Sequence, residues 1–251
     1  MPSLEQVVNP KGHGGAAIGY VVPLRPEAGK SDLQAPMTRG LYAASSLDRK
    51  TVLKFRVMSK EEVGFDPIAV LESPIGATLS PAEKDCVRST WTIVQLTFES
   101  YDPEFFPALD LFHQIAGRLA RLTDGIVADP LAERYLTADM LVPVLKETFD
   151  VRQLVSVKSA GGGRVQTMGL AKLALPEILL TLVPPELEPM AAVLLLSVAA
   201  ETFSDRQLKA GDHFKAGTEW IVAEQPGIGV SGYELLPVEG SVADALLALK
   251  S

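Results

Sequence analysis

The feature that most constrains this chain is an apolar run of eleven residues, Met190–Ala200, which only Ser197 interrupts. The run lies in a helix that we predict from Glu186 to about Phe203, with apolar side chains on all its sides. Such a helix is normally sandwiched inside a domain. A membrane span takes about 20 residues, so we predict a buried helix and no membrane contact. If one face were exposed, we expect it to form a dimer interface.

The segment before this helix predicts a β-hairpin. Leu154–Val157 and Arg164–Gly169 are rich in strand-forming residues, and Ala160–Gly163 between them ends in three consecutive glycines. Consecutive glycines suit a tight turn, because such a turn requires positive φ. With a third strand predicted at Ile178–Val183, the segment Leu154–Phe203 forms the predicted core of the protein.

Other strands are predicted by β-branched and aromatic runs or by a period of two. They are Ala16–Leu24, Thr51–Met58, Pro67–Leu71, Ser89–Glu99, Ile126–Ala128, Trp220–Val222 and Tyr233–Val238.

Helix starts are indicated at Ser80–Glu83, Asp102–Glu104 and Ser241–Asp244, where a capping residue precedes an acidic one. Apolar residues at three- and four-residue spacing continue the second helix to about Leu122. Thr137 is expected to cap a further helix through about Phe149, with a kink at Pro143.

The order of these elements predicts an α+β fold, with a mixed, mainly antiparallel sheet and helices packed on one face. We assign residues 1–80 to an N-terminal α/β portion that begins with a flexible arm, and residues 81–251 to the main α+β domain. Whether the first portion belongs to the same domain is left open. At 251 residues the chain can bury a sufficient core without a disulfide or a structural metal.

The formal net charge of −8 argues against a nucleic-acid partner, which would need clustered cations. The longest basic grouping, Arg49, Lys50, Lys54 and Arg56, is interpreted as a solvated strand edge. An acidic surface suits a basic protein partner instead. The single cysteine, Cys86, and an N-terminus without the pattern of a secretory signal predict a cytoplasmic protein.

Side chains that could carry chemistry have simpler structural interpretations. No histidine has a second His or Cys at metal-ligand spacing, and we predict neither a metal nor a cofactor. His113 is expected at the border of a helix stripe, and Cys86 as a small buried side chain. The glycines before Arg164 lead into a strand rather than a helix, so a hairpin turn is favoured over a phosphate loop.

Four acidic residues, Asp124, Asp129, Glu133 and Asp139, could supply a carboxylate pair for acid–base chemistry. A structural interpretation is favoured for them. Asp129 is expected to start a turn with Pro130, and Glu133 to form a surface pair with Arg134.

One run, Gln166–Ile178, resembles a T-x-G-L-x-x-F-G-L-P-E-(I/L) signature of uncharacterised bacterial domains of unknown function. Asp124–Pro130 is similar to the G-G-x-V-x-D-P strand and turn of the same domains. The resemblance covers about residues 90–205, and it departs from the signature at Leu173 and Ala174. It implies a fold-type grouping and, for some relatives, a role as immunity or interaction proteins. It implies no catalytic residue.

We therefore expect a non-enzymatic, cytoplasmic protein of bacterial type that acts through protein–protein contact, as an immunity protein or adaptor does. The partner is expected to be a basic protein, and a homodimer is a further expectation. The alternative is an enzyme or a small-molecule-binding protein with a cleft between the N-terminal portion and the core. Its pocket candidates are His113, Asp129, Arg134 and Arg164.

Overall fold

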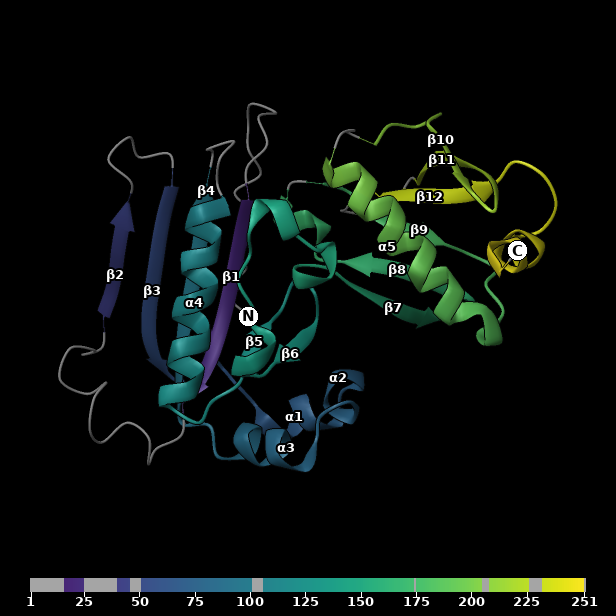
Figure 1. Cartoon of the computed structure of the whole chain (residues 1–251). Coiled ribbons are helices and arrows are strands. Elements are labelled where there is room, and N and C mark those ends of the chain that lie inside the picture. The colour runs from purple at the N-terminus through teal and green to yellow at the C-terminus, as the bar shows by residue number, and fades with distance from the viewer. Residues whose placement is uncertain are drawn as a thin grey trace. The chain divides into compact units, whose positions relative to one another are not determined.

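The computed structural model divides into two compact units, with the boundary between Phe149 and Asp150. Figure 1 shows a sheet and a long helix in each. The structure describes residues 16–24, 40–45, 51–100, 106–173, 175–204, 208–225 and 232–250. The predicted N-terminal arm lies outside these residues.

The first unit contains a six-stranded sheet whose strand pairs are all antiparallel. The strand order is β2-β3-β4-β1-β5-β6. The strands are β1 (Ala16–Leu24), β2 (Gly40–Ser45), β3 (Thr51–Ser59), β4 (Thr92–Ser100), β5 (Val127–Asp129) and β6 (Arg134–Leu136). The first strand of the chain thus lies inside the sheet, between β4 and β5.

Helix α4 (Phe106–Leu122) covers one face of this sheet, and the predicted amphipathic helix is confirmed. Its apolar side chains face the strands because they recur at helical spacing. Phe112 is fully buried, and its ring centroid lies 5.6 Å from that of Phe98 in β4. The core of the first unit therefore lies between α4 and the sheet.

Strand β3 lies between β2 and β4, so Lys54 and Arg56 are not on a sheet edge. The expected solvated strand edge is wrong for these two residues. They share one face of an interior strand, and Arg56 is exposed there opposite Gln95.

Three short helices join β3 to β4: α1 (Pro67–Glu72), α2 (Pro74–Ala77) and α3 (Pro81–Arg88). The predicted strand Pro67–Leu71 is wrong, because this run forms α1. Asp66 caps that helix by accepting from the Ile68 amide at 2.9 Å, and Pro67 occupies a first-turn position that needs no N–H. The capping box that Ser80 and Glu83 predict for α3 is confirmed.

The predicted helix from Thr137 to Phe149 is also wrong. Only the 3₁₀ helices η2 (Ala138–Met140) and η3 (Lys146–Thr148) form there, and Thr137 makes no side-chain cap bond. Pro143 lies between them. A proline disfavours helical backbone in the residue before it and has no N–H to donate, so the segment is interrupted rather than kinked.

The second unit contains a six-stranded sheet in the order β10-β11-β12-β9-β8-β7. Strands β9 and β12 are parallel, and the other neighbours are antiparallel. The strands are β7 (Ser156–Gly161), β8 (Arg164–Met168), β9 (Glu177–Leu180), β10 (His213–Ala216), β11 (Thr218–Gln225) and β12 (Gly232–Pro237). The predicted glycine hairpin is confirmed, with positive φ at Gly161, Gly162 and Gly163.

Helix α5 (Glu188–Ser204) packs on β7, β8 and β9, and Figure 1 shows it lying across these strands. The remaining helices are η4 (Val151–Gln153), η5 (Leu170–Leu173), η6 (Pro185–Leu187), α6 (Val242–Leu247) and η7 (Ala248–Lys250). The capping box predicted at Ser241 is confirmed at the start of α6.

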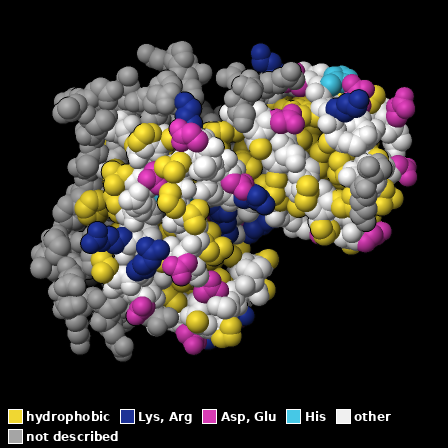
Figure 2. Space-filling model, viewed as in Figure 1, with side chains coloured by type: hydrophobic (Ala, Val, Ile, Leu, Met, Phe, Trp, Pro, Cys, Tyr) yellow, Lys and Arg dark blue, Asp and Glu magenta, His cyan; other side chains and the backbone are white. Residues whose placement is uncertain are grey.

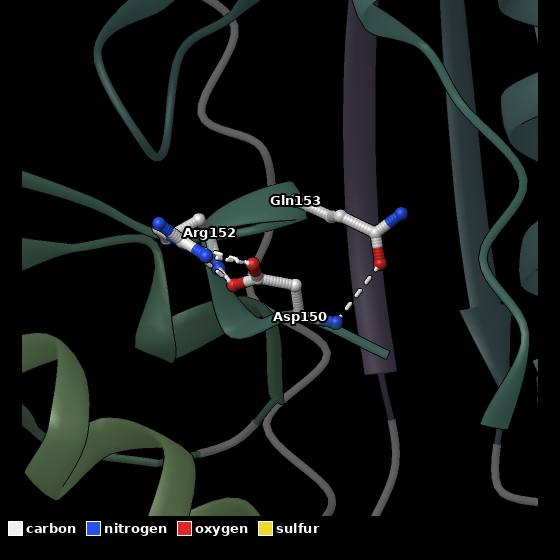
Figure 3. A network of polar contacts seen from close by, with 3 residues as sticks. All are labelled: Asp150, Arg152 and Gln153. Atoms are coloured by element: carbon white, nitrogen blue, oxygen red, sulfur yellow. Dashed lines mark hydrogen bonds and ion pairs between the residues drawn. The ribbon is translucent and has the colours of Figure 1, made fainter. Parts of the chain in front are cut away.

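The second unit begins with a capped turn at Asp150 (Figure 3). Asp150 accepts from the Arg152 amide at 2.9 Å and also pairs with the Arg152 guanidinium, while the Asp150 amide donates to Gln153 Oε1. The hydrogen bond from the Arg152 side chain lowers the pKa of the Asp150 carboxyl below its usual range. These contacts fix η4 at the start of the unit.

The α+β class is confirmed, with mainly antiparallel strands arranged in two sheets rather than one. The units divide at residue 149 and not near residue 80, because β1–β3 pair with β4 in one sheet. Within the described residues, no helix is long and apolar enough to cross a membrane.

Candidate functional site

The outward side of α5 is the most distinctive surface of the second unit. Exposed residues recur there at every fourth position, in the row Pro189, Val193, Ser197 and Glu201. A half-buried row runs beside it, with the residues Glu188, Ala192, Leu196 and Ala200. We call these two rows together the α5 face. Val193, near its middle, is 64% exposed.

The α5 face corrects one expectation from the sequence. An all-round apolar helix was predicted to be sandwiched, and Leu194, Leu195 and Val198 are indeed buried against the unit. However, α5 forms a single layer over the sheet, so the side of the helix that faces away from the sheet is not covered by another layer of its own unit. Pro189 and Val193 of the exposed row are therefore apolar, where a surface helix normally carries polar side chains.

The serine in the middle of this face does little to make it polar. Ser197 Oγ donates to the carbonyl oxygen of Val193 at 3.0 Å, one turn earlier in the same helix. A hydroxyl that bonds to its own backbone in this way has its one donor already satisfied. The centre of the α5 face thus combines two aliphatic residues, Val193 and Leu196, with small side chains around them.

Acidic residues mark both ends of the α5 face. Glu188 heads the half-buried row, and its Oε1 accepts from Ser159 Oγ of β7 at 2.9 Å. Glu201 ends the exposed row at the other end of the helix. Between Lys172 and Arg206 the sequence contains no Lys, Arg or His. The helix therefore presents an apolar centre with negative charge at each end and no cation of its own.

Leu182 adds an exposed side chain on the loop that leads from β9 towards α5. It is 80% exposed, and its φ of 57° places it in the left-handed region, which leucine rarely adopts. The loop is held by the hairpin turn, because the Val183 amide donates to the Gly163 carbonyl at 2.9 Å. Residue 163 must be small, since an added Cβ would come within 3.1 Å of the Val183 oxygen.

Figure 2 shows hydrophobic side chains gathered over the region of α5. Large contiguous apolar patches on soluble proteins mark interaction sites, whereas single exposed apolar residues are normal. The apolar centre and the acidic ends make this surface a candidate for binding another protein, and Leu182 is a further exposed apolar side chain of the same unit.

A hydrogen-bonded cluster around Glu177 gives the signature-like run a structural role. The Glu177 carboxylate accepts from Thr167 Oγ1 at 2.7 Å, from the Gly169 amide at 2.9 Å and from the Ala171 amide at 3.2 Å. Burial raises the pKa of Glu177 above its ordinary value, and these hydrogen bonds oppose that shift. The Thr, Gly and Glu positions of the run thus hold β8, η5 and β9 together.

Lys172, in the same run, is fully buried. Its Nζ donates to the carbonyl oxygen of Leu154 at 2.6 Å, at the end of η4. A buried ammonium group is tolerated only where it is hydrogen-bonded. The contact fixes η5 against η4 and so supports the same layer of the unit that α5 covers.

The four pocket candidates lie in both units. Asp129 and Arg134 come together in the first unit, with Asp129 Oδ2 3.2 Å from Arg134 Nε and the aspartate fully buried. His113 is buried on α4, where its ring lies 6.2 Å from that of Phe112. Arg164 is exposed at the start of β8 in the second unit. The cleft that would join these residues stays a prediction.

Asp129 has a structural part in its turn, because its Oδ1 accepts from the Ala132 amide at 3.3 Å. Arg134 forms an ion pair with Asp129. The expected surface pair between Glu133 and Arg134 stays a prediction. Asp139 lies on the surface and pairs with Arg121 at 3.4 Å. The acidic set is therefore dispersed over turns and surface rather than converging.

Cys86 is buried in a small cluster with Leu79, Val87 and Ile126, and its Sγ lies 3.5 Å from the Asp124 carbonyl oxygen. Tyr135 packs against this cluster, and burial raises its pKa to about 12. Both groups therefore act as packing side chains. Among the residues that the structure describes, no group of three or more His, Cys, Asp and Glu side chains could hold a metal ion.

The sequence offered the apolar run of α5 as an interface only if one of its faces were exposed, and sequence reasoning missed Leu182. One signal was available for the face, namely the long interval from Lys172 to Arg206 without a cation. No sequence signal marks Leu182, because its exposure and its positive φ follow from how the loop meets the hairpin turn.

The chain was compared with protein-family models, with curated proteins and with solved structures, and no match was found in any of the three comparisons.

Proposed function

We propose that this protein acts by binding another protein, that the α5 face is the contact surface and that the partner is basic. The observation that carries the proposal is the apolar centre of the α5 face, with Val193 exposed and Leu196 half-buried, and with an acidic residue at each end of the face. Apolar area supplies the free energy of such a contact, and the charges select the partner and speed its approach. An adaptor or immunity protein would use its surface in this way.

A cytoplasmic location belongs to the same proposal. The only cysteine is buried and unpaired, which suits a reducing compartment. The partner is then a cytoplasmic protein, or one that is neutralised there.

Photo-crosslinking from single positions tests the proposal. A benzoylphenylalanine placed at residue 193 in cells of the source organism is expected to form one discrete adduct. Mass spectrometry should identify the partner as a protein of basic net charge. The purified partner should bind the wild-type protein at least about tenfold more tightly than Val193→Glu, since the variant places a charge in the apolar contact.

The matched control is residue 111. Leu111 is 55% exposed on α4, which like α5 is a helix of 17 residues. The same crosslinker at residue 111 should give no such adduct, and Leu111→Glu should bind the purified partner as the wild type does. Equal adducts from both positions, no adduct from residue 193, or an acidic partner would contradict the proposal.

A further inference from the structure

We propose that the two units turn about a hinge with a single axis, the Cα–C bond of Phe149. The chain passes from the first unit to the second once, between Phe149 and Asp150. Hinges between domains consist of a few residues at the ends of elements, which absorb the change in φ and ψ. This inference is independent of the proposed function, because it involves neither the α5 face nor a partner.

Phe149 is attached to the first unit by its side chain. Its ring centroid lies 5.3 Å from that of Phe106, the buried first residue of α4, and the two ring planes meet at 70°. The segment before Phe149 is held one turn further along the same helix, where the Val144 amide donates to Asp110 Oδ1 at 2.9 Å. These two contacts fix the chain as far as the Cα atom of Phe149.

The peptide group that follows Phe149 is attached to the second unit instead. Its N–H is the amide of Asp150, which donates to Gln153 Oε1 at 3.2 Å (Figure 3). Because a peptide group is planar, this hydrogen bond holds the whole group against η4 and restrains φ of Asp150. Helix η4 is itself fixed in the unit, since Val151 and Leu154 are buried.

The torsion that these attachments leave variable is ψ of Phe149. Phe149 has a φ of −61° and a ψ of 126°, in the extended region, where ψ between about 100° and 180° is sterically allowed. A turn within this range reorients one unit against the other and keeps the contacts of Phe149 and Asp150. A turn about φ of Asp150 would instead move its amide away from Gln153. The Gln153 side chain therefore restricts the hinge to one axis.

Distances between spin labels test the inference on the full chain. The labels are attached to Leu111→Cys on α4 and to Leu247→Cys on α6, both exposed positions, in a Cys86→Ala background that has no other cysteine. The pair Leu111→Cys and Ile68→Cys, within the first unit, gives the reference width that the labels alone cause. Pulsed electron paramagnetic resonance measures each distance distribution.

The distribution between the units should be at least about twice as wide as the reference, because ψ of Phe149 varies. Gln153→Ala frees φ of Asp150 and should widen the distribution by at least about a further 1.5-fold. Arg152→Ala is the matched control. It removes the guanidinium from the Asp150 carboxylate but leaves the peptide group attached, so the width should not change. Circular dichroism confirms that each variant is folded.

Two glycines inserted after Phe149 give the width of an unrestrained joint, which should exceed that of every other variant. A wild-type distribution as narrow as the reference overturns the inference, and so does one as wide as that of the glycine insertion. The single axis is wrong if Gln153→Ala leaves the width unchanged or if Arg152→Ala widens it equally. None of these outcomes decides the crosslinking experiment at residue 193.

Discussion

At the scale of single residues, Leu182 combines two unfavourable properties that its surroundings impose. Its side chain lies in solvent, and its backbone adopts the left-handed region. Leucine in that region costs about 1–2 kcal/mol, and asparagine costs less there. Such a conformation in a residue other than glycine is a reason to propose a functional role for it.

We therefore expect Leu182→Asn to raise the free energy of unfolding by about 0.5–1 kcal/mol and to weaken partner binding. Urea denaturation measures the first effect and titration with the purified partner the second. Leu111→Asn makes the same change within a helix, and it should lower stability without changing binding. A Leu182→Asn variant that is both less stable and fully active would contradict the role assigned to this residue.

Glu177 gives a prediction about pH. Burial raises its pKa in the folded state, so the folded protein holds this proton more tightly than the unfolded chain does. Its contribution to stability is fully present below the unfolded pKa of about 4.3 and is lost as the pH rises through the folded pKa. Glutamine at this position does not titrate.

The free energy of unfolding of the wild type, minus that of Glu177→Gln, should therefore decrease as the pH rises from about 4 to about 7. Urea denaturation across this range measures it. In Thr167→Val the carboxylate loses a hydrogen bond that lowers its pKa, so the decrease should extend to higher pH. A difference that stays constant with pH would show that Glu177 has the same pKa in both states.

At the scale of elements, helix caps and tight turns were predictable from the sequence, because each needs a particular residue type at a particular backbone position. Ser80 with Glu83, and the glycines of the β7–β8 turn, are examples. The helix at Pro67–Leu71 was not predictable in this way, because a short apolar run fits a strand or a helix equally well. The N-cap at Asp66 favours the helix. The α5 face depends on tertiary structure, since only the arrangement of layers determines which side of an apolar helix is covered.

Gly76 allows a stringent test of how α1 and α2 meet. A Cβ on this residue would lie 2.3 Å from the Val70 carbonyl oxygen and 2.5 Å from that of Leu71. Because both neighbours are backbone atoms, Gly76→Ala should lower the free energy of unfolding by about 3 kcal/mol.

Gly162→Ala is the comparison, since Gly162 has a φ of 61° and open space around its Cβ position. It should cost only the backbone penalty of about 1 kcal/mol. Both values come from urea denaturation at one pH. Equal losses in the two variants would mean that α1 and α2 are not in the close contact described.

At the scale of the whole molecule, the strand order of each sheet was beyond prediction from the sequence. Strand β1 pairs with β4 across nearly seventy residues of intervening chain, and β12 pairs with β9 in parallel. Such pairings depend on how the whole chain is arranged and leave no local pattern. The same holds for the dispersal of the pocket candidates, with His113, Asp129 and Arg134 in one unit and Arg164 in the other.

The two tryptophans report on the two units separately. Trp91 is 55% exposed in the first unit, whereas Trp220 is fully buried in β11 and donates to the Ala216 carbonyl at 3.1 Å. In Trp91→Phe, fluorescence therefore follows the second unit alone. Adding Gly76→Ala should leave the free energy of this transition unchanged within about 0.5 kcal/mol, because compact units unfold on their own. If Gly76→Ala lowered the free energy of unfolding measured by Trp220 fluorescence as much as that measured by circular dichroism, the two units would unfold as one.

The central place of β12 determines when the second sheet can form. Every strand of the first sheet lies before residue 137, so that sheet can close while the ribosome is still adding the rest of the chain. The second sheet consists of β7–β8–β9 and β10–β11 until β12, at residues 232–237, joins the two parts. Until then the edges of β9 and β11 that β12 covers have no strand beside them. The nascent chain is therefore most exposed to proteases and to aggregation in the interval just before its last strand is made.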